Sequence, residues 1–585
     1  MSAVMQLREF ASYATTPALD TPPSSSQNQM DAAIARLREG AKTFAKLPLD
    51  RRIALVNAMQ QGFLRVAKRM VQAGCKAKGI TLGKPEEAEE WATGPWGVVR
   101  QLRLIRESLA ALKHSGDTPI GPVGRTIDGR LSVRLFPGNA IDGMLFKNIT
   151  AEVRMQAGVT EESLRRDRAR FYRQPDHDGR VVLVLGAGNI AAIAPMDVIT
   201  KMFNEGKVVL LKMNPVNAYL GPYIEEAFAE AIRQKFLAVV YGGADEGRYL
   251  VYHRDIDEVH ITGSDKTHDN IVWGPPGPER QTRMQRHEPL LKKPITSELG
   301  NVSPFIVVPG PYSAKELRYQ AEDAATSYLM NASFMCCAAK MLVLPKDWAG
   351  SDVFVQTLQE TCAKVPPRKA YYPGAEDRWR KLTTGRAQEK HLGNAEPGSL
   401  PWTFISGLDP SAPDEPLFTQ ESFCSVISDT RVGSADPVEY LERAVDFCNN
   451  TLWGTLNANL IVHPQSLKDP RINEAVERAI AKLRYGVIAV NAFIGLPFVF
   501  AAPTWGAYPG STPEDIQSGS GFVHNTSMLE GVEKAVLRAP LTTFPKPGYF
   551  ASHRTSHKMV PKLVAMEMNA GWAKVPGIVF DAMRG

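Results

Sequence analysis

Residues 180–213 read RVVLVLGAGNIAAIAPMDVITKMFNEGKVVLLKM. Two short runs of mainly β-branched and apolar residues, at 181–185 and 208–212, flank a segment whose apolar residues have helical spacing. The same alternation continues with FLAVVYG at 236–242 and DEVHITG at 257–263. Strands that alternate with helices build a parallel sheet covered on both faces, so this stretch predicts an α/β domain.

A second series of the same kind follows. It begins near residue 295 with ITSEL and PFIVV, and it continues with a helical pattern at 314–329 and the strand-like runs MLVLP, LNANLIV and GVIAVN. The segment between the two series, at 275–296, is rich in Pro, Gly and charge, which is typical of a boundary. The sequence therefore predicts two tandem α/β units.

The rest of the chain is less regular. Residues 18–29 are rich in Pro, Ser and Gln and predict a flexible lead-in, whereas residues 30–111 repeat apolar residues at helical steps. Residues 118–165 mix a strand-like run with several Pro and Gly. The segment from residue 529 onwards carries scattered apolar residues. We interpret it as a packing or subunit contact, with peripheral membrane contact as the alternative.

The composition excludes several classes of protein. The 585 residues are 44% hydrophobic and 22% charged, which excludes a disordered, collagen-like or coiled-coil chain. The net charge of +6 is spread along the chain without a basic block, so we expect no nucleic acid partner. The six cysteines lack the spacing of a disulfide framework or a zinc site, which favours a reducing compartment and no metal.

Targeting and membrane signals are weak. The first twenty residues lack the basic cap and apolar run of a secretory signal. The most apolar stretch, at 487–502, is short and is broken by Asn491, Gly495 and Pro497. Such a stretch does not span a bilayer, so we expect no integral membrane segment and a cytoplasmic protein.

Gly186 and Gly188 follow the first strand of the α/β region in the pattern G-x-G-x-x-A. This pattern is a dinucleotide-binding fingerprint when an acid ends the next strand. That position holds Lys212, followed by Asn214 and Pro215. An ordinary Rossmann dehydrogenase therefore stays only as an alternative.

A second set of motifs fits the chain better. Asn189 and Lys212 are 212 − 189 = 23 residues apart, and SELGNVSPFIVV at 297–308 precedes NASFMCCAAK at 331–340. The further members are Gly243, Gly247, Thr262-Gly263-Ser264, Glu421, Phe423, Gly486 and Asn491. In this order the chain resembles the aldehyde dehydrogenase superfamily over roughly residues 30–525.

Three departures indicate a divergent branch of that superfamily. Gly188-Asn189 stands where the superfamily usually has Trp-Asn, and Leu299-Gly300-Asn301 stands where it has Leu-Gly-Gly. Lys340 lies four residues after Cys336, whereas the superfamily usually has Arg five residues after its catalytic cysteine. The substrate is therefore not inherited from a well-known member.

The resemblance implies catalysis by a thiol. Cys336 would attack the aldehyde carbonyl, and Cys337 is the alternative nucleophile because the Lys340 spacing shifts the alignment by one. Glu298 would be the general base, and Asn189 would donate to the oxyanion together with the backbone N–H of Cys336. Each also has an ordinary structural alternative: a buried cysteine, a strand-end carboxylate and a turn asparagine.

The resemblance also implies a site for NAD or NADP. Lys212 and Glu421 would bind the two riboses, and Phe423 would pack against the nicotinamide. Gly243, Gly247, Gly263 and Ser264 would lie along the dinucleotide, although Thr262-Gly263-Ser264 is equally a helix cap. Pro215 stands where NAD-preferring members carry a Glu, which removes repulsion of a 2′-phosphate and leaves both cofactors open.

We therefore predict an α/β, aldehyde dehydrogenase-like fold with two tandem parallel-sheet domains plus an oligomerisation arm. Residues 30–117 and 166–295 would bind the dinucleotide, and 296–492 would be the catalytic domain. Residues 118–165 and 526–585 would form the oligomerisation arm and C-terminal extension, behind a flexible lead-in at 1–29. The chain would form a homo-oligomer, a dimer or tetramer.

The predicted activity is NAD(P)-dependent oxidation of an aldehyde to a carboxylic acid through a cysteine thiohemiacetal and thioester. Two alternatives stay open. One is a coenzyme A-acylating aldehyde dehydrogenase or acyl reductase, which would use the same thiol without Glu298. The other is a non-catalytic, dinucleotide-binding scaffold protein.

Overall fold

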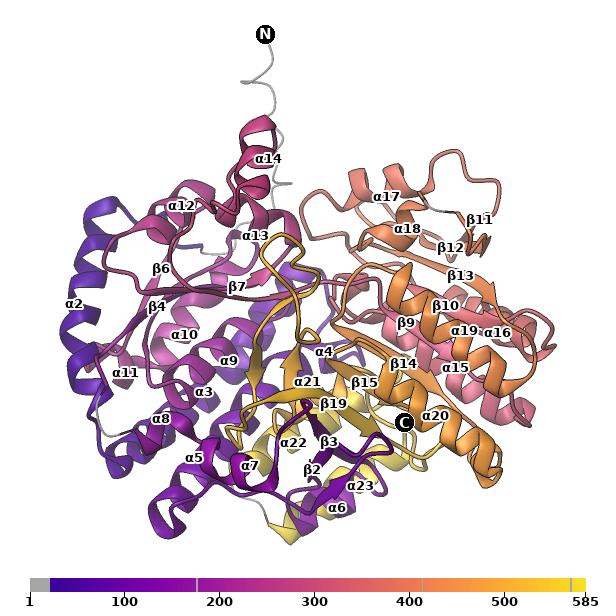
Figure 1. Cartoon of the computed structure of the whole chain (residues 1–585), viewed down its shortest axis with the longest axis horizontal. Coiled ribbons are helices and arrows are strands. Elements are labelled where there is room, and N and C mark those ends of the chain that lie inside the picture. The colour runs from indigo at the N-terminus through magenta and orange to yellow at the C-terminus, as the bar shows by residue number, and fades with distance from the viewer. Residues whose placement is uncertain (1–20, 175–176, 413, 569–570) are drawn as a thin grey trace.

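The computed structural model of the chain describes residues 21–174, 177–412, 414–568 and 571–585. Within them two large sheets, of six and eleven strands, stand side by side with helices packed around both, and two further strands form a two-stranded ribbon of their own (Figure 1). The smaller sheet lies on the left of Figure 1, and the strands β9 to β13 of the larger sheet lie on the right. The predicted α/β class with two parallel-rich units is confirmed.

The smaller sheet has the strand order β17-β8-β7-β4-β5-β6. Its parallel strands are β4 (Val181–Leu185), β5 (Val208–Lys212), β6 (Leu237–Val240), β7 (Glu258–Gly263) and β8 (Ile295–Leu299), and β17 (Gly519–Ser520) is antiparallel. The connections contain α9 (Ile193–Ile199), the π-helix η2 (Thr200–Asn204), η3 (Pro215–Leu220), α10 (Gly221–Ala227), α11 (Ala229–Arg233), α12 (Ala244–Tyr252), α13 (Asp265–Val272) and α14 (Pro278–Gln285).

One expectation about this sheet is wrong. The strand ITSEL at 295–299 does not open the second unit, because it pairs with β7 as a further strand of the first sheet. The two sheets therefore part after Leu299, and the Pro- and Gly-rich segment before residue 295 is a connection inside the first sheet.

The N-terminal region is helical. Its helix α2 (Gln27–Ala45) packs on the smaller sheet, and α3 (Leu49–Lys78) and α5 (Gly97–Ser115) pack against each other and against the helices α10, α11 and α9 of that sheet. The short α4 (Glu87–Trp91) and the π-helix η1 (Ala92–Trp96) pack against α3. The side chain of Ser26 caps α2, so the predicted flexible lead-in already ends before Gln27. Its residues 1–20 lie outside the described part of the chain.

The larger sheet has the order β1-β2-β3-β19-β15-β14-β9-β10-β13-β12-β11. Its strands are β1 (Val123–Arg125), β2 (Leu131–Phe136), β3 (Thr150–Met155), β9 (Pro304–Val307), β10 (Met341–Pro345), β11 (Glu389–Leu392), β12 (Trp402–Leu408), β13 (Val426–Val432), β14 (Asn457–Ile461), β15 (Val487–Val490) and β19 (Val532–Arg538). Strands from the irregular regions 118–165 and 526–585 thus extend this sheet through antiparallel β3–β19 pairing.

Helices accompany the larger sheet along the chain. They are α15 (Ala314–Leu329), η4 (Met330–Ser333), α16 (Gly350–Ala363), α17 (Ala375–Thr383), α18 (Pro416–Thr419), α19 (Pro437–Asn450), η5 (Ser466–Lys468), α20 (Pro470–Lys482) and α21 (Leu496–Phe500). The other elements are α6 (Ala140–Leu145), α7 (Glu161–Asp167), α8 (Arg170–Arg173), the ribbon β16 (Thr504–Gly506) with β18 (Phe522–His524), α22 (Ser556–Met568), η6 (Trp572–Lys574) and α23 (Val575–Met583). Among the described residues, no helix combines the length and the apolar character that a bilayer crossing needs.

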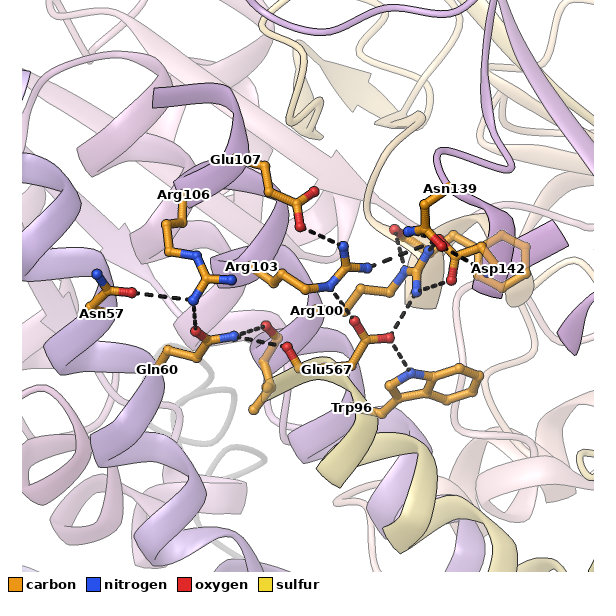
Figure 2. A network of polar contacts seen from close by, with 12 residues as sticks. Asn57, Gln60, Trp96, Arg100, Arg103, Arg106, Glu107, Asn139, Asp142 and Glu567 are labelled. Atoms are coloured by element: carbon orange, nitrogen blue, oxygen red, sulfur yellow. Dashed lines mark hydrogen bonds and ion pairs between the residues drawn. The ribbon is translucent and has the colours of Figure 1, made fainter. Parts of the chain in front are cut away.

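A buried ionic network fastens α22 to the N-terminal helices (Figure 2). Arg100 of α5 contacts Glu567 of α22 at 2.7 Å and Asp142 of α6 at 2.8 Å, and Arg103 contacts Glu567 at 2.7 Å. Burial alone would lower the pKa of Arg100, but Glu567 and Asp142 raise it above its usual value. The charges compensate one another, which is the condition for burying them.

We predict that Glu567→Gln destabilises the protein by about 3 kcal/mol, because two buried guanidinium groups lose a shared carboxylate. Urea unfolding measures the change in free energy. The matched control is Glu474→Gln, which removes an exposed ion pair with Arg478 and should cost less than about 0.5 kcal/mol. Equal costs for the two variants would contradict the role given to the network.

Candidate active site

The thiol of Cys336 lies in the turn that joins α15 to β10. The turn opens with three successive residues of positive φ, Asn331 at 52°, Ala332 at 53° and Ser333 at 67°. L-residues seldom adopt this left-handed region, so neighbouring contacts must hold the turn. Of the six cysteines, only Cys336 is not buried, and Cys337 beside it is 4% exposed.

The peptide carbonyl of Cys336 is held by two side chains. Ser303 donates its hydroxyl to this carbonyl at 3.2 Å, and the Asn457 amide donates to it at 3.4 Å. The side-chain carbonyl of Asn301 accepts from both, at 2.9 Å from Ser303 and 3.2 Å from Asn457. Asn301, one of the departures from the superfamily pattern, therefore organises the groups that fix the cysteine backbone.

Glu298 is buried beside the thiol. It lies on β8 opposite Thr262 of β7, and its side chain is 3% exposed. Burial raises the pKa of this carboxyl to about 8, and the charge of Asp197 adds to the rise, whereas the Trp505 indole and the Cys336 thiol next to it lower it. A carboxyl with this pKa can take up or release a proton near neutral pH.

The same surroundings change the pKa of the Cys336 thiol. The neighbouring Cys337 thiol, desolvation and the Glu298 carboxyl together hold the pKa of Cys336 well above its usual value. Because a thiolate and a carboxylate repel each other, ionisation of either group opposes ionisation of the other.

Asn189 joins the first sheet to the cysteine turn. It follows β4, is 6% exposed, and donates its side-chain amide to the carbonyl of Phe334 at 3.0 Å. Phe334 precedes Cys336 by two residues, so this bond brings the amide to the thiol. An asparagine amide has two N–H groups, and the bond to Phe334 uses one of them.

Glu421 and Lys340 lie on the other side of the cysteine turn. Burial raises the pKa of Glu421 to about 7, while the Lys340 ammonium works against the rise. Lys340 donates to the carbonyl and the hydroxyl of Ser333, both at 3.0 Å, and so braces the strained turn. Glu421 lies over Gly300, where a Cβ would stand 2.1 Å from its Oε2 atom, so any other residue there would displace this carboxylate.

Phe423 lies against the same turn. Its ring centroid is 4.9 Å from that of Tyr372 and 5.9 Å from that of Phe334. Arg378 donates to the Phe423 carbonyl at 3.2 Å and places its guanidinium over the ring. The sequence-predicted residues Cys336, Glu298, Asn189, Glu421 and Phe423 are thus linked around one turn.

Lys212 ends β5 in a separate group. Its side chain is 7% exposed, and burial lowers the pKa of its ammonium to about 8, with Glu246 of α12 acting in the opposite direction. Among the described residues, no hydrogen-bond acceptor of this ammonium is seen. A buried cation without a hydrogen-bond partner fits the hydroxyls of a ribose.

Local structure accounts for some of the residues predicted to line the dinucleotide and not for others. Gly243 precedes α12 and donates its N–H to Glu246 at 2.7 Å. A Cβ at Gly247 would meet no protein atom within 4 Å, so packing inside the chain does not require this glycine. Gly263 ends β7, and Ser264 caps α13 by accepting from the N–H of Thr267 at 3.2 Å, which is the ordinary cap foreseen as the alternative.

Comparison with known proteins finds a similarity over part of this arrangement. The model of the aldehyde dehydrogenase family matches residues 143–375, less than half of the chain, and these residues include Asn189, Lys212, Glu298 and Cys336. Over this segment the chain is similar to aldehyde dehydrogenases.

Curated relatives are distant and are matched in part. The chain is 27% identical over 219 residues to 4-trimethylaminobutyraldehyde dehydrogenase of Rattus norvegicus, covering 36% of this chain and 39% of that one. It is 24% identical over 271 residues to the aldehyde dehydrogenase LUC3 of a Fusarium species, covering 44% and 55%. The matches thus span less than two thirds of these relatives' own lengths.

Solved structures share the fold over most of the chain. Succinic semialdehyde dehydrogenase from Streptococcus pyogenes, solved with NADP+, has a TM-score of 0.59 at 17% identity and covers 88% of this chain and 96% of its own. A glyceraldehyde-3-phosphate dehydrogenase from Bacillus halodurans, solved with NADP, has a TM-score of 0.57 at 18% identity and covers 89% and 93%. The aldehyde dehydrogenase-like fold is therefore confirmed.

Sequence reasoning missed several residues of this site. Asp197 and Trp505 change the proton affinity of Glu298, and Asn457 holds the cysteine backbone. Burial lowers the pKa of the Lys212 ammonium, and the charge of Glu246 raises it. The sequence does not reveal these residues, because each one acts on a residue that lies far away along the chain.

We predict that iodoacetamide labels Cys336 alone among the six cysteines, and that the rate keeps rising above pH 9 because the thiol pKa is raised. Glu298→Gln should shift this profile to lower pH, since a negative neighbour that opposes the thiolate is removed. Peptide mass spectrometry after timed alkylation measures both effects. Labelling that survives Cys336→Ala and disappears in Cys337→Ala would assign the reactive thiol to Cys337.

Proposed function

We propose that the protein oxidises an aldehyde to a carboxylic acid with NAD or NADP, with Cys336 as nucleophile and Glu298 as general base. The observation that carries the proposal is the buried Glu298 carboxyl, with its pKa near 8, beside the accessible thiol. The partial sequence matches to dehydrogenases of aldehydes support the same chemistry. The proposal does not specify which aldehyde is the substrate.

The residues divide the reaction into two halves. The Cys336 sulfur forms a bond to the aldehyde carbon and the thiol proton passes to the carbonyl oxygen, which produces a thiohemiacetal. Bound NAD or NADP would supply the hydride acceptor that turns the thiohemiacetal into a thioester. Glu298 then takes a proton from water as the water oxygen attacks the thioester, and the acid leaves with release of the thiol.

Asn189 and the backbone N–H of Cys336 would stabilise the oxyanion in both halves. The Asn189 amide is already fixed by its bond to Phe334, so little reorganisation is needed when charge develops. Lys212 and Glu421 would hold the riboses. Glu421 has a buried carboxylate oxygen without a hydrogen-bond partner among the described residues, and Lys212 is a largely buried cation. Phe423 would face the nicotinamide, and Gly243, Gly247, Gly263 and Ser264 would line the dinucleotide path.

The proposal extends to organisation and location. Residues around the smaller sheet would form the dinucleotide-binding domain, and the larger sheet would carry the catalytic domain. The antiparallel strands from 118–165 and 526–585 would serve as the arm of a homo-oligomer. We place the protein in the cytoplasm, in keeping with its six unpaired cysteines.

Glu298 distinguishes hydrolysis from transfer to coenzyme A. We predict that Glu298→Gln keeps a first-turnover burst of NAD(P)H but loses steady-state turnover by about 100-fold, because thioester hydrolysis loses its base. In the unmodified protein the hydrolytic rate should rise with pH through about 8, as the carboxyl ionises. Stopped-flow absorbance with a panel of aldehydes, with and without coenzyme A, measures both rates.

An unchanged steady state in this variant would remove Glu298 from the base role and favour acyl transfer. Turnover that requires coenzyme A in the unmodified protein would have the same meaning. Absence of NAD(P)H formation with every aldehyde, combined with intact dinucleotide binding, would favour the non-catalytic scaffold.

Cofactor choice should depend on acids near Lys212. Pro215 offers neither charge nor N–H, but Glu246 supplies a carboxylate to the same ammonium. We predict a discrimination between NAD and NADP within about tenfold, or ~1.4 kcal/mol. Pro215→Glu should weaken NADP and Glu246→Gln should strengthen it, because a carboxylate repels the 2′-phosphate. Fluorescence titration with both cofactors tests this, and a hundredfold preference for NAD in the unmodified protein would contradict it.

A further inference from the structure

The peptide carbonyl of Asn189 receives an unusual number of donors. Tyr371 donates its hydroxyl at 2.9 Å, Lys78 its ammonium at 3.1 Å, and Asn331 its side-chain amide at 3.1 Å. A carbonyl oxygen has two lone pairs, so three donors, one of them charged, saturate it. The backbone of Asn189 is therefore fixed as firmly as its side chain, which is bonded to Phe334.

The donors are themselves held in place. Lys78, the last residue of α3, forms an ion pair of 2.6 Å with Glu90 of α4, and both side chains are almost fully buried. The Tyr371 hydroxyl also contacts the Asn331 side-chain oxygen at 3.0 Å. Glu89 accepts from the backbone N–H of Asn331 at 2.9 Å.

The cluster contacts the two segments that flank the thiol. One is Asn189 itself, and the other is the turn of positive φ that begins at Asn331 and leads to Cys336. A buried ion pair is rarely the most stable way to fill a core, so the placement of Lys78 and Glu90 calls for a reason beyond stability. That reason is their contact with Asn189, the proposed donor to the oxyanion.

We propose that Tyr371 and the Lys78–Glu90 pair are positioning residues that fix the Asn189 amide for the oxyanion; this rests on the proposed function. None of them touches the reacting atoms. They act by keeping Asn189 and the turn at 331–334 in one geometry, which matters because displacement of about 1 Å can cost a hundredfold in rate.

Tyr371→Phe is the sharpest test, since it removes one hydroxyl and leaves the ring. The first-turnover rate of NAD(P)H formation should fall about tenfold, while KM for the aldehyde and Kd for the cofactor stay within about twofold. The matched control is Tyr485→Phe, which removes a buried hydroxyl that donates to the Cys448 carbonyl at 2.9 Å. The control should keep the full rate.

A double-mutant cycle separates positioning from general support. Tyr371→Phe should have no further effect in the Asn189→Ala background, because its influence passes through the missing amide. The double variant Lys78→Met with Glu90→Met removes both buried charges without leaving one unpaired. It should reproduce the loss of rate with an unchanged unfolding midpoint.

The outcomes are distinguishable. If Asn189→Ala is slow and Tyr371→Phe slows it further by the same factor as in the unmodified protein, the positioning role is wrong and the proposed function stands. If the rate falls only in proportion to a loss of folded protein, or equally in Tyr485→Phe, the cluster is structural support alone. If Asn189→Ala retains the full rate, the oxyanion role and this inference both fail.

Discussion

A thiol and a carboxyl lie against each other in the site, and they cannot both be ionised at low cost. This constraint contributes to the raised pKa of Cys336, after the neighbouring Cys337 thiol and burial, whereas burial is the main cause that raises the Glu298 pKa to about 8. It also separates the two halves of the proposed reaction. The carboxyl is neutral enough not to repel the thiolate at the moment of attack, and it is basic enough to accept a proton from water afterwards.

The surrounding structure maintains that arrangement through polar contacts from both sheets. Asn189 comes from the smaller sheet, whereas Ser303 and Asn457 belong to the segments of the larger one, and all three bond to the turn around Cys336. The turn has little intrinsic preference for its positive φ angles, so these bonds determine its shape. The N-terminal helices contribute as well, because α3 ends at Lys78 against Asn189.

Sequence reasoning located what depends on local pattern. The runs at β4 and β5 are entirely apolar up to Leu185 and Lys212, and such runs identify buried parallel strands without ambiguity. Asn189, Glu298 and Cys336 were found because each stands in a short motif that resembles the superfamily pattern. Lys78 and Tyr371 were not, because they meet Asn189 across 111 and 182 residues. The strand at 295–299 was assigned to the wrong unit, since its pairing partner is not encoded in its own sequence.

The departures from the superfamily pattern form a linked set around this turn. A Cβ at Gly188 would stand 2.6 Å from the Asn214 side-chain oxygen and 2.8 Å from Val216, so a tryptophan there would not fit. Asn301 supplies an amide that glycine lacks, and Lys340 reaches Ser333 from a position one residue closer to the thiol. The first change lets Asn214 and Val216 pack against the backbone beside Asn189, and the other two add hydrogen bonds that hold the cysteine turn. The chain therefore lacks the large side chain that the superfamily usually has at residue 188, and hydrogen bonds from Asn301 and Lys340 hold the turn that carries the thiol.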